Sequence, residues 1–174
     1  RDVPIRQRSL RRVFDSAWSF LTPDEQDAYR RLSMFRTSFG REAAQAVAGT
    51  SARMLLALVN KSMLRRTTDG RFDLHPLLAQ YAHDRLRSDP EALVETQHRY
   101  CRYYLDFLES QARALHGPGQ KEALDALASE GEHVRTAWLR AIDLGWHNEA
   151  NAVLETLHLF HESRSYLVFD SFLS

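Results

Sequence analysis

The fold is decided by residues 63–74, which read Met63-Leu64-Arg65-Arg66-Thr67-Thr68-Asp69-Gly70-Arg71-Phe72-Asp73-Leu74. An Asp-Gly corner between two extended runs is the strongest short signal of a β-hairpin, because the turn residues need positive φ. If Asp69-Gly70 forms a two-residue loop, Arg66 lies opposite Asp73 and the two charges pair across the strands. The stretch therefore predicts a hairpin with that register.

Helical patterns surround the hairpin. Before it, apolar residues spaced by three and four predict four helices, over residues 9–21, 23–35, 40–48 and 51–61. We expect Ser9 to cap the first helix, Thr22 and Glu25 to form a capping box for the second, and Gly49 to end the third. Another helix is expected from His75. Helices, then a hairpin, then a helix is the winged-helix order, so residues 9–87 are predicted to be a winged-helix domain after a linker of residues 1–8.

The remainder of the chain is predicted to be helical. Residues 88–119 are expected to form a long connecting helix to about Leu115, broken by Gly117-Pro118-Gly119. Helices are then predicted over residues 121–129, 132–144 and 149–161, with another beginning near Ser165. The expected fold class is thus mainly α: a winged helix with one β-hairpin, followed by an array of antiparallel helices over residues 120–174.

Charge is distributed unevenly along the chain. The 174 residues hold 23 basic and 23 acidic side chains, but residues 1–87 hold 16 against 9 and residues 88–174 hold 7 against 14. Such asymmetry indicates different partners for the two halves. The longest apolar run, residues 54–59, is too short to cross a bilayer, and the single cysteine suits a reducing compartment. We expect no membrane partner and a cytoplasmic location.

The basic half raises the question of DNA binding. Arg65, Arg66 and Arg71 on the wing could contact phosphates. However, residues 51–61 hold six consecutive apolar residues, with Arg53, Asn60 and Lys61 around them, and are predicted to be buried on most of the helix circumference. We therefore expect a protein-facing surface and keep a DNA-binding winged-helix regulator as the alternative.

Several segments of the first half resemble one protein family. They are residues 9–18, 21–26, 32–35, 39–44, 58–64 and 74–82. In order and spacing they are similar to the winged-helix domain that follows the nucleotide-binding core in the signal-transduction ATPases with numerous domains (STAND ATPases, with an NB-ARC-like core). The resemblance covers nearly all of residues 9–87. It implies a parent protein that binds ATP and ADP, and a winged helix that contacts the nucleotide-binding core of the same chain until activation.

His75 is the one nucleotide-binding candidate. Leu74-His75-Pro76 occupies the place of the family's Met-His-Asp motif, whose histidine touches the β-phosphate of ADP, although Pro76 removes a carboxylate and a backbone donor. A helix start would favour an anion there; the alternative is that His75 only caps the helix. None of the seven glycines lies in a phosphate-binding loop, and we expect no catalytic residue, no metal site at His158 and His161, and no enzymatic activity in this chain.

The second half carries a weaker resemblance. Residues 144–150 resemble the turn of a tetratricopeptide repeat, with Gly145 allowing close approach, an aromatic filling the gap, and Ala150 letting the helices close. Residues 133–138 resemble the first helices of the repeat array in bacterial STAND ATPases. This implies that a protein or small-molecule inducer binds at the repeats. The alternative is an ordinary helical bundle in which Trp138, Trp146 and Phe160 are packing residues.

Overall fold

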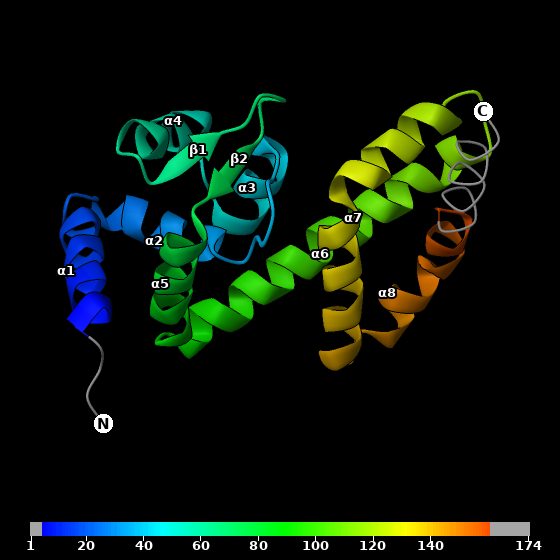
Figure 1. Ribbon diagram of the computed structural model, residues 1–174. Helices are drawn as coiled ribbons and strands as arrows, with labels where there is room; N and C mark the ends of the chain where they lie inside the picture. The colour runs from blue at the N-terminus through cyan, green and yellow to red at the C-terminus, as the bar shows by residue number, and fades with distance from the viewer. Residues whose placement is uncertain (1–4, 161–174) are drawn as a thin grey trace. The chain divides into compact units, whose positions relative to one another are not determined.

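The computed structural model describes residues 5–160 (Figure 1). It is mainly helical with one β-hairpin, which confirms the predicted fold class. The chain divides into two compact units, residues 1–99 and residues 100–174.

The first unit has the winged-helix order of elements. In sequence these are α1 (Ile5–Ser19), α2 (Pro23–Leu32), α3 (Arg41–Ala48), α4 (Ala52–Asn60), β1 (Leu64–Arg66), β2 (Phe72–Leu74), α5 (Pro76–Arg87) and the first part of α6 (Pro90–Leu115). Phe39, between α2 and α3, exchanges two backbone hydrogen bonds of 2.9 Å with Phe72 and so adds a bridge to the hairpin. α2 packs against both α3 and α5, and α4 packs against β1 of the hairpin.

The hairpin forms, but with a different register from the one predicted. The Thr67 amide donates to Arg71 O at 2.9 Å, so the loop holds Thr68, Asp69 and Gly70, and of the last two only Gly70 has a positive φ, of 81°. Three-residue loops commonly end in such a left-handed glycine. The added loop residue pairs Arg65 with Asp73, so the prediction that Arg66 lies opposite Asp73 was wrong.

The helix ends of this unit follow the capping signals in most places. The capping box of α2 is confirmed: Glu25 N donates to Thr22 Oγ1 at 3.3 Å, and Thr22 N donates to Glu25 Oε2 at 2.8 Å. Gly49 ends α3 with a φ of 66°, as expected. The prediction for Ser9 was wrong, because α1 begins at Ile5 and Ser9 lies within it. α2 ends at Leu32, three residues before the predicted end at Phe35.

A non-glycine residue holds the left-handed position after α4. Ser62 has a φ of 59°, and its amide donates to Val59 O at 2.9 Å while the Met63 amide donates to Leu58 O at 2.9 Å. This pair of bonds is the Schellman motif, which usually places glycine where Ser62 stands. The chain turns there from α4 into β1.

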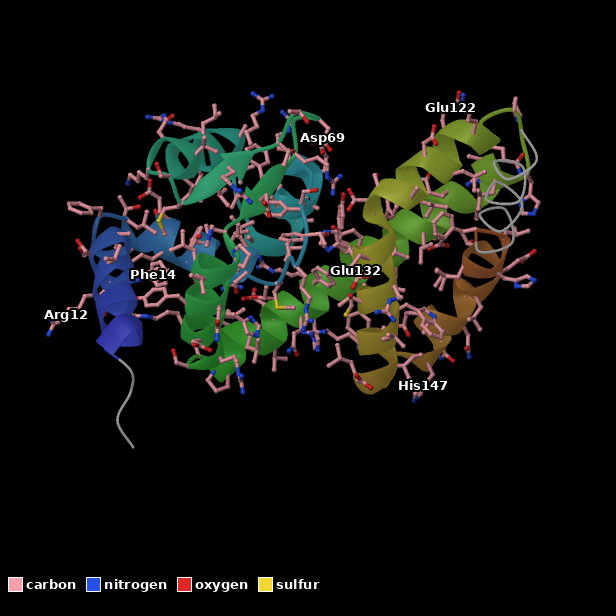
Figure 2. All side chains as sticks on the ribbon, in the orientation of Figure 1. Arg12, Phe14, Asp69, Glu122, Glu132 and His147 are labelled. Atoms are coloured by element: carbon pink, nitrogen blue, oxygen red, sulfur yellow. The ribbon has the colours of Figure 1, made fainter. Side chains whose placement is uncertain are left out.

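The core of the first unit joins its helices to the hairpin. Its largest fully buried side chains are Tyr29, Leu32, Phe39, Val47, Leu55, Leu58 and Leu86. Tyr29 OH donates to Met63 O at 3.0 Å, which connects α2 to the residue before β1. α1 contributes aromatic contacts to α5: Phe14 lies on the side of α1 that faces α5 (Figure 2), and its ring centroid is 5.8 Å from that of Tyr81.

The second unit contains the rest of α6, then α7 (Gln120–Asp143) and α8 (His147–Ala152), followed by helical residues 154–160. The prediction of separate helices over residues 121–129 and 132–144 was wrong, since α7 continues through Gly131. A single glycine costs a helix about 1 kcal/mol relative to alanine and does not by itself end it. The helix predicted over residues 149–161 begins at His147 and is interrupted at Val153. The helix predicted near Ser165 lies outside the described residues.

The turn between α7 and α8 has a defined backbone geometry. Gly145 has a φ of 79°; its amide donates to Ile142 O at 2.9 Å and the Trp146 amide donates to Ala141 O at 2.8 Å. A Cβ at Gly145 would meet no atom within 4 Å. Gly145 therefore supplies a left-handed backbone, and the prediction that it permits close helix approach was wrong. Ala150 is buried as expected, and its carbonyl accepts from Trp138 Nε1 at 3.0 Å.

Candidate functional site on the winged-helix unit

The three wing arginines have different surroundings. Arg65 Nη2 lies 2.5 Å from Asp73 Oδ2. Arg71 donates to Ser38, from Nε to Oγ at 3.1 Å and from Nη2 to the carbonyl oxygen at 2.6 Å. Arg66 is exposed, and among the described residues it shows no hydrogen-bond or ion-pair partner. Of the three predicted phosphate contacts, Arg66 alone presents a guanidinium that no carboxylate or carbonyl holds.

α4 does not have the burial that its apolar sequence predicts. Only Leu55 and Leu58 are buried, while Leu56 is 51% exposed, so the prediction of a helix buried on most of its circumference was wrong. A short helix at the edge of a core buries one stripe and leaves the other side to solvent. The exposed side carries Arg53 and Asn60, two turns apart, with Leu56 between them. These are residue types that read guanine and adenine, but an apolar side chain separates them.

Lys61, at the end of α4, is held by the capping box of α2. Its Nζ donates to Glu25 Oε2 at 2.6 Å and to Phe20 O at 3.1 Å. The hydrogen bond from Lys61, with the backbone hydrogen bond from Thr22, holds the pKa of Glu25 below its usual range. The ammonium of Lys61 is thus matched by a carboxylate within the unit.

A second group of basic residues is matched by acidic partners on α2 and the start of α6. Arg30 lies 2.8 Å from Asp89, Arg31 lies 2.7 Å from Glu95, and Asp27 contacts both arginines. The hydrogen bond from Arg31 lowers the pKa of Glu95. The charge count of residues 1–87 does not reveal this group, because Asp89 and Glu95, two of its three acidic residues, lie beyond residue 87. The basic surplus of residues 1–87 therefore overstates the charge that remains for a partner.

His75 stands at the N-cap of α5. It is exposed, and its Nδ1 accepts a hydrogen bond from the Leu77 amide at 3.3 Å, with Pro76 at the first helical position. This confirms the capping role that we kept as the alternative. Because Nδ1 is the acceptor, the ring proton is assigned to Nε2. The contact between His75 and a nucleotide stays a prediction.

The start of α5 offers an anion fewer donors than expected. Pro76 has no N–H, the Leu77 amide is bonded to His75, and the Ala79 amide donates to His75 O at 2.9 Å. Within the described residues, only the Leu78 amide of this first turn shows no acceptor. A phosphate at this end would therefore depend on the His75 side chain more than on the helix backbone.

The second unit holds an apolar groove of about 710 Å³ between α7 and residues 154–160. Its apolar lining includes Trp138, Leu139, Leu154, Leu157 and Phe160. Leu139 and Leu154 are 44% and 42% exposed, which marks the groove as a surface that a partner could cover. His158 lies on its wall, His161 lies outside the described residues, and no metal-binding group of histidines, cysteines and carboxylates occurs in residues 5–160.

Among the residues that the structure describes, no helix is both long enough and apolar enough to cross a bilayer.

Comparison with known proteins gives one kind of match. The chain is 29% identical over 170 residues to candidate HTH-type transcriptional regulators of Mycobacterium tuberculosis, strains H37Rv and CDC 1551, and of Mycobacterium bovis. The aligned region covers 88% of this chain and 18% of each relative, so the chain spans less than a fifth of their length. No family model matches the chain, and no solved structure matches it.

Proposed function

We propose that this chain is a regulatory segment of a longer transcriptional regulator, and that its winged-helix unit makes protein contacts and does not read DNA. The similarity to HTH-type transcriptional regulators supports the first part. The second part rests chiefly on one observation: Arg65 and Arg71 of the wing are held by Asp73 and Ser38. A DNA-reading wing needs such side chains for phosphates.

The length of the relatives is consistent with DNA binding by a part of the protein outside this segment. More than four-fifths of each relative lies outside the aligned region, so the DNA-binding part that their name implies has ample room elsewhere. In this segment, the side chains on α4 that could contact DNA bases are Arg53 and Asn60, and the exposed Leu56 lies between them. Titration of the chain with duplex DNA at two salt concentrations tests the proposal; the expected result is weak binding that salt abolishes.

We further propose that the parent protein is a nucleotide-switch ATPase of the STAND type, as the sequence resemblance implies, and that this segment has no catalytic activity of its own. In that protein, the Nε2–H of His75 would donate to a phosphate of bound ADP. The exposed position of His75 supports this role, as does the assignment of its ring proton to Nε2, the nitrogen that the capping bond does not use. The winged-helix unit would then relay the nucleotide state, and the groove of the helical unit would take the inducer or a protein partner.

Two substitutions at His75 separate the nucleotide contact from the cap in the longer protein. Asn is a good N-cap residue, so His75→Asn keeps an acceptor for the Leu77 amide and removes the imidazole donor. His75→Ala removes both. If His75 contacts ADP, both variants weaken ADP binding by a similar factor. Unchanged ADP affinity in His75→Asn would remove His75 from the site.

A DNA-binding winged helix is the second candidate function. The name of the relatives favours it, as do Arg53, Asn60 and Arg66, which are all exposed. If it is correct, the chain binds a preferred duplex at physiological salt, and Arg53→Ala and Asn60→Ala each relax the preference at one base pair.

A further inference from the structure

α6 is one unbroken helix that belongs to both units. It runs from Pro90 to Leu115, whereas the boundary between the units falls between Arg99 and Tyr100. The buried face of the helix continues through this boundary, because Thr96 is 0% exposed and Tyr100, one turn later, is 1% exposed. No turn, glycine or proline separates the two parts of the helix.

The first part of α6 is anchored within the winged-helix unit. Arg30 of α2 pairs with Asp89 at 2.8 Å, and Asp89 caps α6 by accepting from the Ala92 amide at 3.1 Å. Arg31 pairs with Glu95 and donates to Thr96 Oγ1 at 3.2 Å. These contacts hold the first turns of α6 against α2.

The later part of α6 is anchored within the helical unit, on α7. Tyr100 OH lies 3.0 Å from Nδ1 of His133, and the ring of His133 stacks on Tyr104 with centroids 5.3 Å apart. Tyr104 OH also donates to Glu130 Oε2 at 3.1 Å. His133 is 1% exposed and Tyr104 is 0% exposed, so this attachment is part of the core of the unit.

Helix formation is cooperative, which makes the shared helix consequential. Ending α6 at the boundary would leave the last four carbonyls of one part and the first four amides of the other without their helical partners. We propose that α6 couples the stabilities of the two units, so that loosening the winged-helix unit also loosens the helical unit. This inference deepens the relay role proposed above and rests on it for its biological meaning.

The full chain labelled with 5-fluorotryptophan tests the coupling. Trp18 is buried in the first unit, whereas Trp138 and Trp146 lie in the second, so ¹⁹F resonances report on each unit separately. Glu25→Ala removes the side-chain half of the capping box and the Lys61 pair, and both lie inside the first unit. If α6 couples the units, the urea midpoints of all three resonances fall together.

Substitutions at His98 show whether α6 carries the effect. His98 is an exposed residue of α6 just before the boundary. His98→Pro breaks the helix, whereas His98→Ala removes the same side chain and leaves the helix intact. In the Pro background, Glu25→Ala should shift Trp18 alone; in the Ala background it should shift all three. If His98→Pro does not fold, His98→Gly should reduce the shift at Trp138 and Trp146.

Two results would overturn the inference. The first is a Glu25→Ala shift confined to Trp18 although α6 is intact. The second is a shift at Trp138 and Trp146 that is equally large with and without the helix break. Neither result depends on DNA or nucleotide, so failure of the coupling and failure of the proposed function are distinguishable.

Discussion

Replacement of Glu25 by alanine should cause the largest loss of stability among the carboxylates that the structure describes in the first unit. Glu25 Oε2 accepts from the Thr22 amide at 2.8 Å and from Lys61 Nζ at 2.6 Å, and the side chain is 10% exposed. The substitution removes the hydrogen bond from the Thr22 amide, which costs about 1 kcal/mol, while the bond from the amide of residue 25 to Thr22 Oγ1 remains. A charged hydrogen bond to a partly exposed partner contributes about 1 kcal/mol more. We expect a loss of about 2 kcal/mol, or about 30-fold in the unfolding equilibrium.

Urea titration followed at Trp18 measures this loss, and two further variants control it. Glu42→Ala removes a carboxylate that is 69% exposed and that, among the described residues, pairs with Arg41 alone, so it should change stability by less than about 0.5 kcal/mol. Glu25→Gln keeps an acceptor for Thr22 and should lose less than Glu25→Ala. Equal midpoints for Glu25→Ala and Glu42→Ala would refute the reasoning that the cap and the Lys61 pair stabilise the unit.

Three further predictions follow from local geometry. Ser62→Gly should stabilise the first unit by about 0.5–1 kcal/mol, because glycine adopts the left-handed backbone at this position without strain. Gly145→Ala should destabilise the second unit by about 1 kcal/mol for the converse reason. The two substitutions should therefore shift the urea midpoints in opposite directions. Thr50→Val should be neutral or stabilising in the same assay, since Thr50 Oγ1 is buried without a hydrogen-bond partner within the described structure. The fold lowers the pKa values of Glu25 and Asp89 from their usual 4.5 and 3.8. Both carboxylates therefore stabilise the fold above these pH values, and the stabilisation should be lost as the pH falls below them. Thermal melts from pH 6 to pH 3 measure this loss, which should be smaller in Glu25→Gln.

Local sequence signals predicted the elements well, and long-range contacts account for most of what they missed. The Asp69-Gly70 corner placed the hairpin, but a three-residue loop and a two-residue loop share that corner, so the pairing moved by one residue. Gly131 was predicted to end a helix, but α7 continues through it, because buried residues on both sides of Gly131 stabilise the helix by more than the glycine costs. The Thr22 and Glu25 capping box was predicted correctly because all of its partners are local.

The candidate site shows the same limit. Sequence spacing predicts neither the pair of Arg65 with Asp73 nor the hydrogen bonds of Arg71 to Ser38. The first depends on the hairpin register, and the second depends on the bridge at Phe39. The capping role of His75 was foreseeable from the proline that follows it.

Titration of the chain with duplex DNA at about 50 mM and about 200 mM salt tests most directly whether the winged-helix unit reads DNA. If Arg66 and about one other cation contact phosphates, affinity should fall about tenfold between these salt concentrations, with no preferred sequence and no effect of Arg53→Ala. Saturable binding of one duplex at the higher salt concentration, with a Kd near or below about 10⁻⁸ M and lost in Arg53→Ala, would contradict the account.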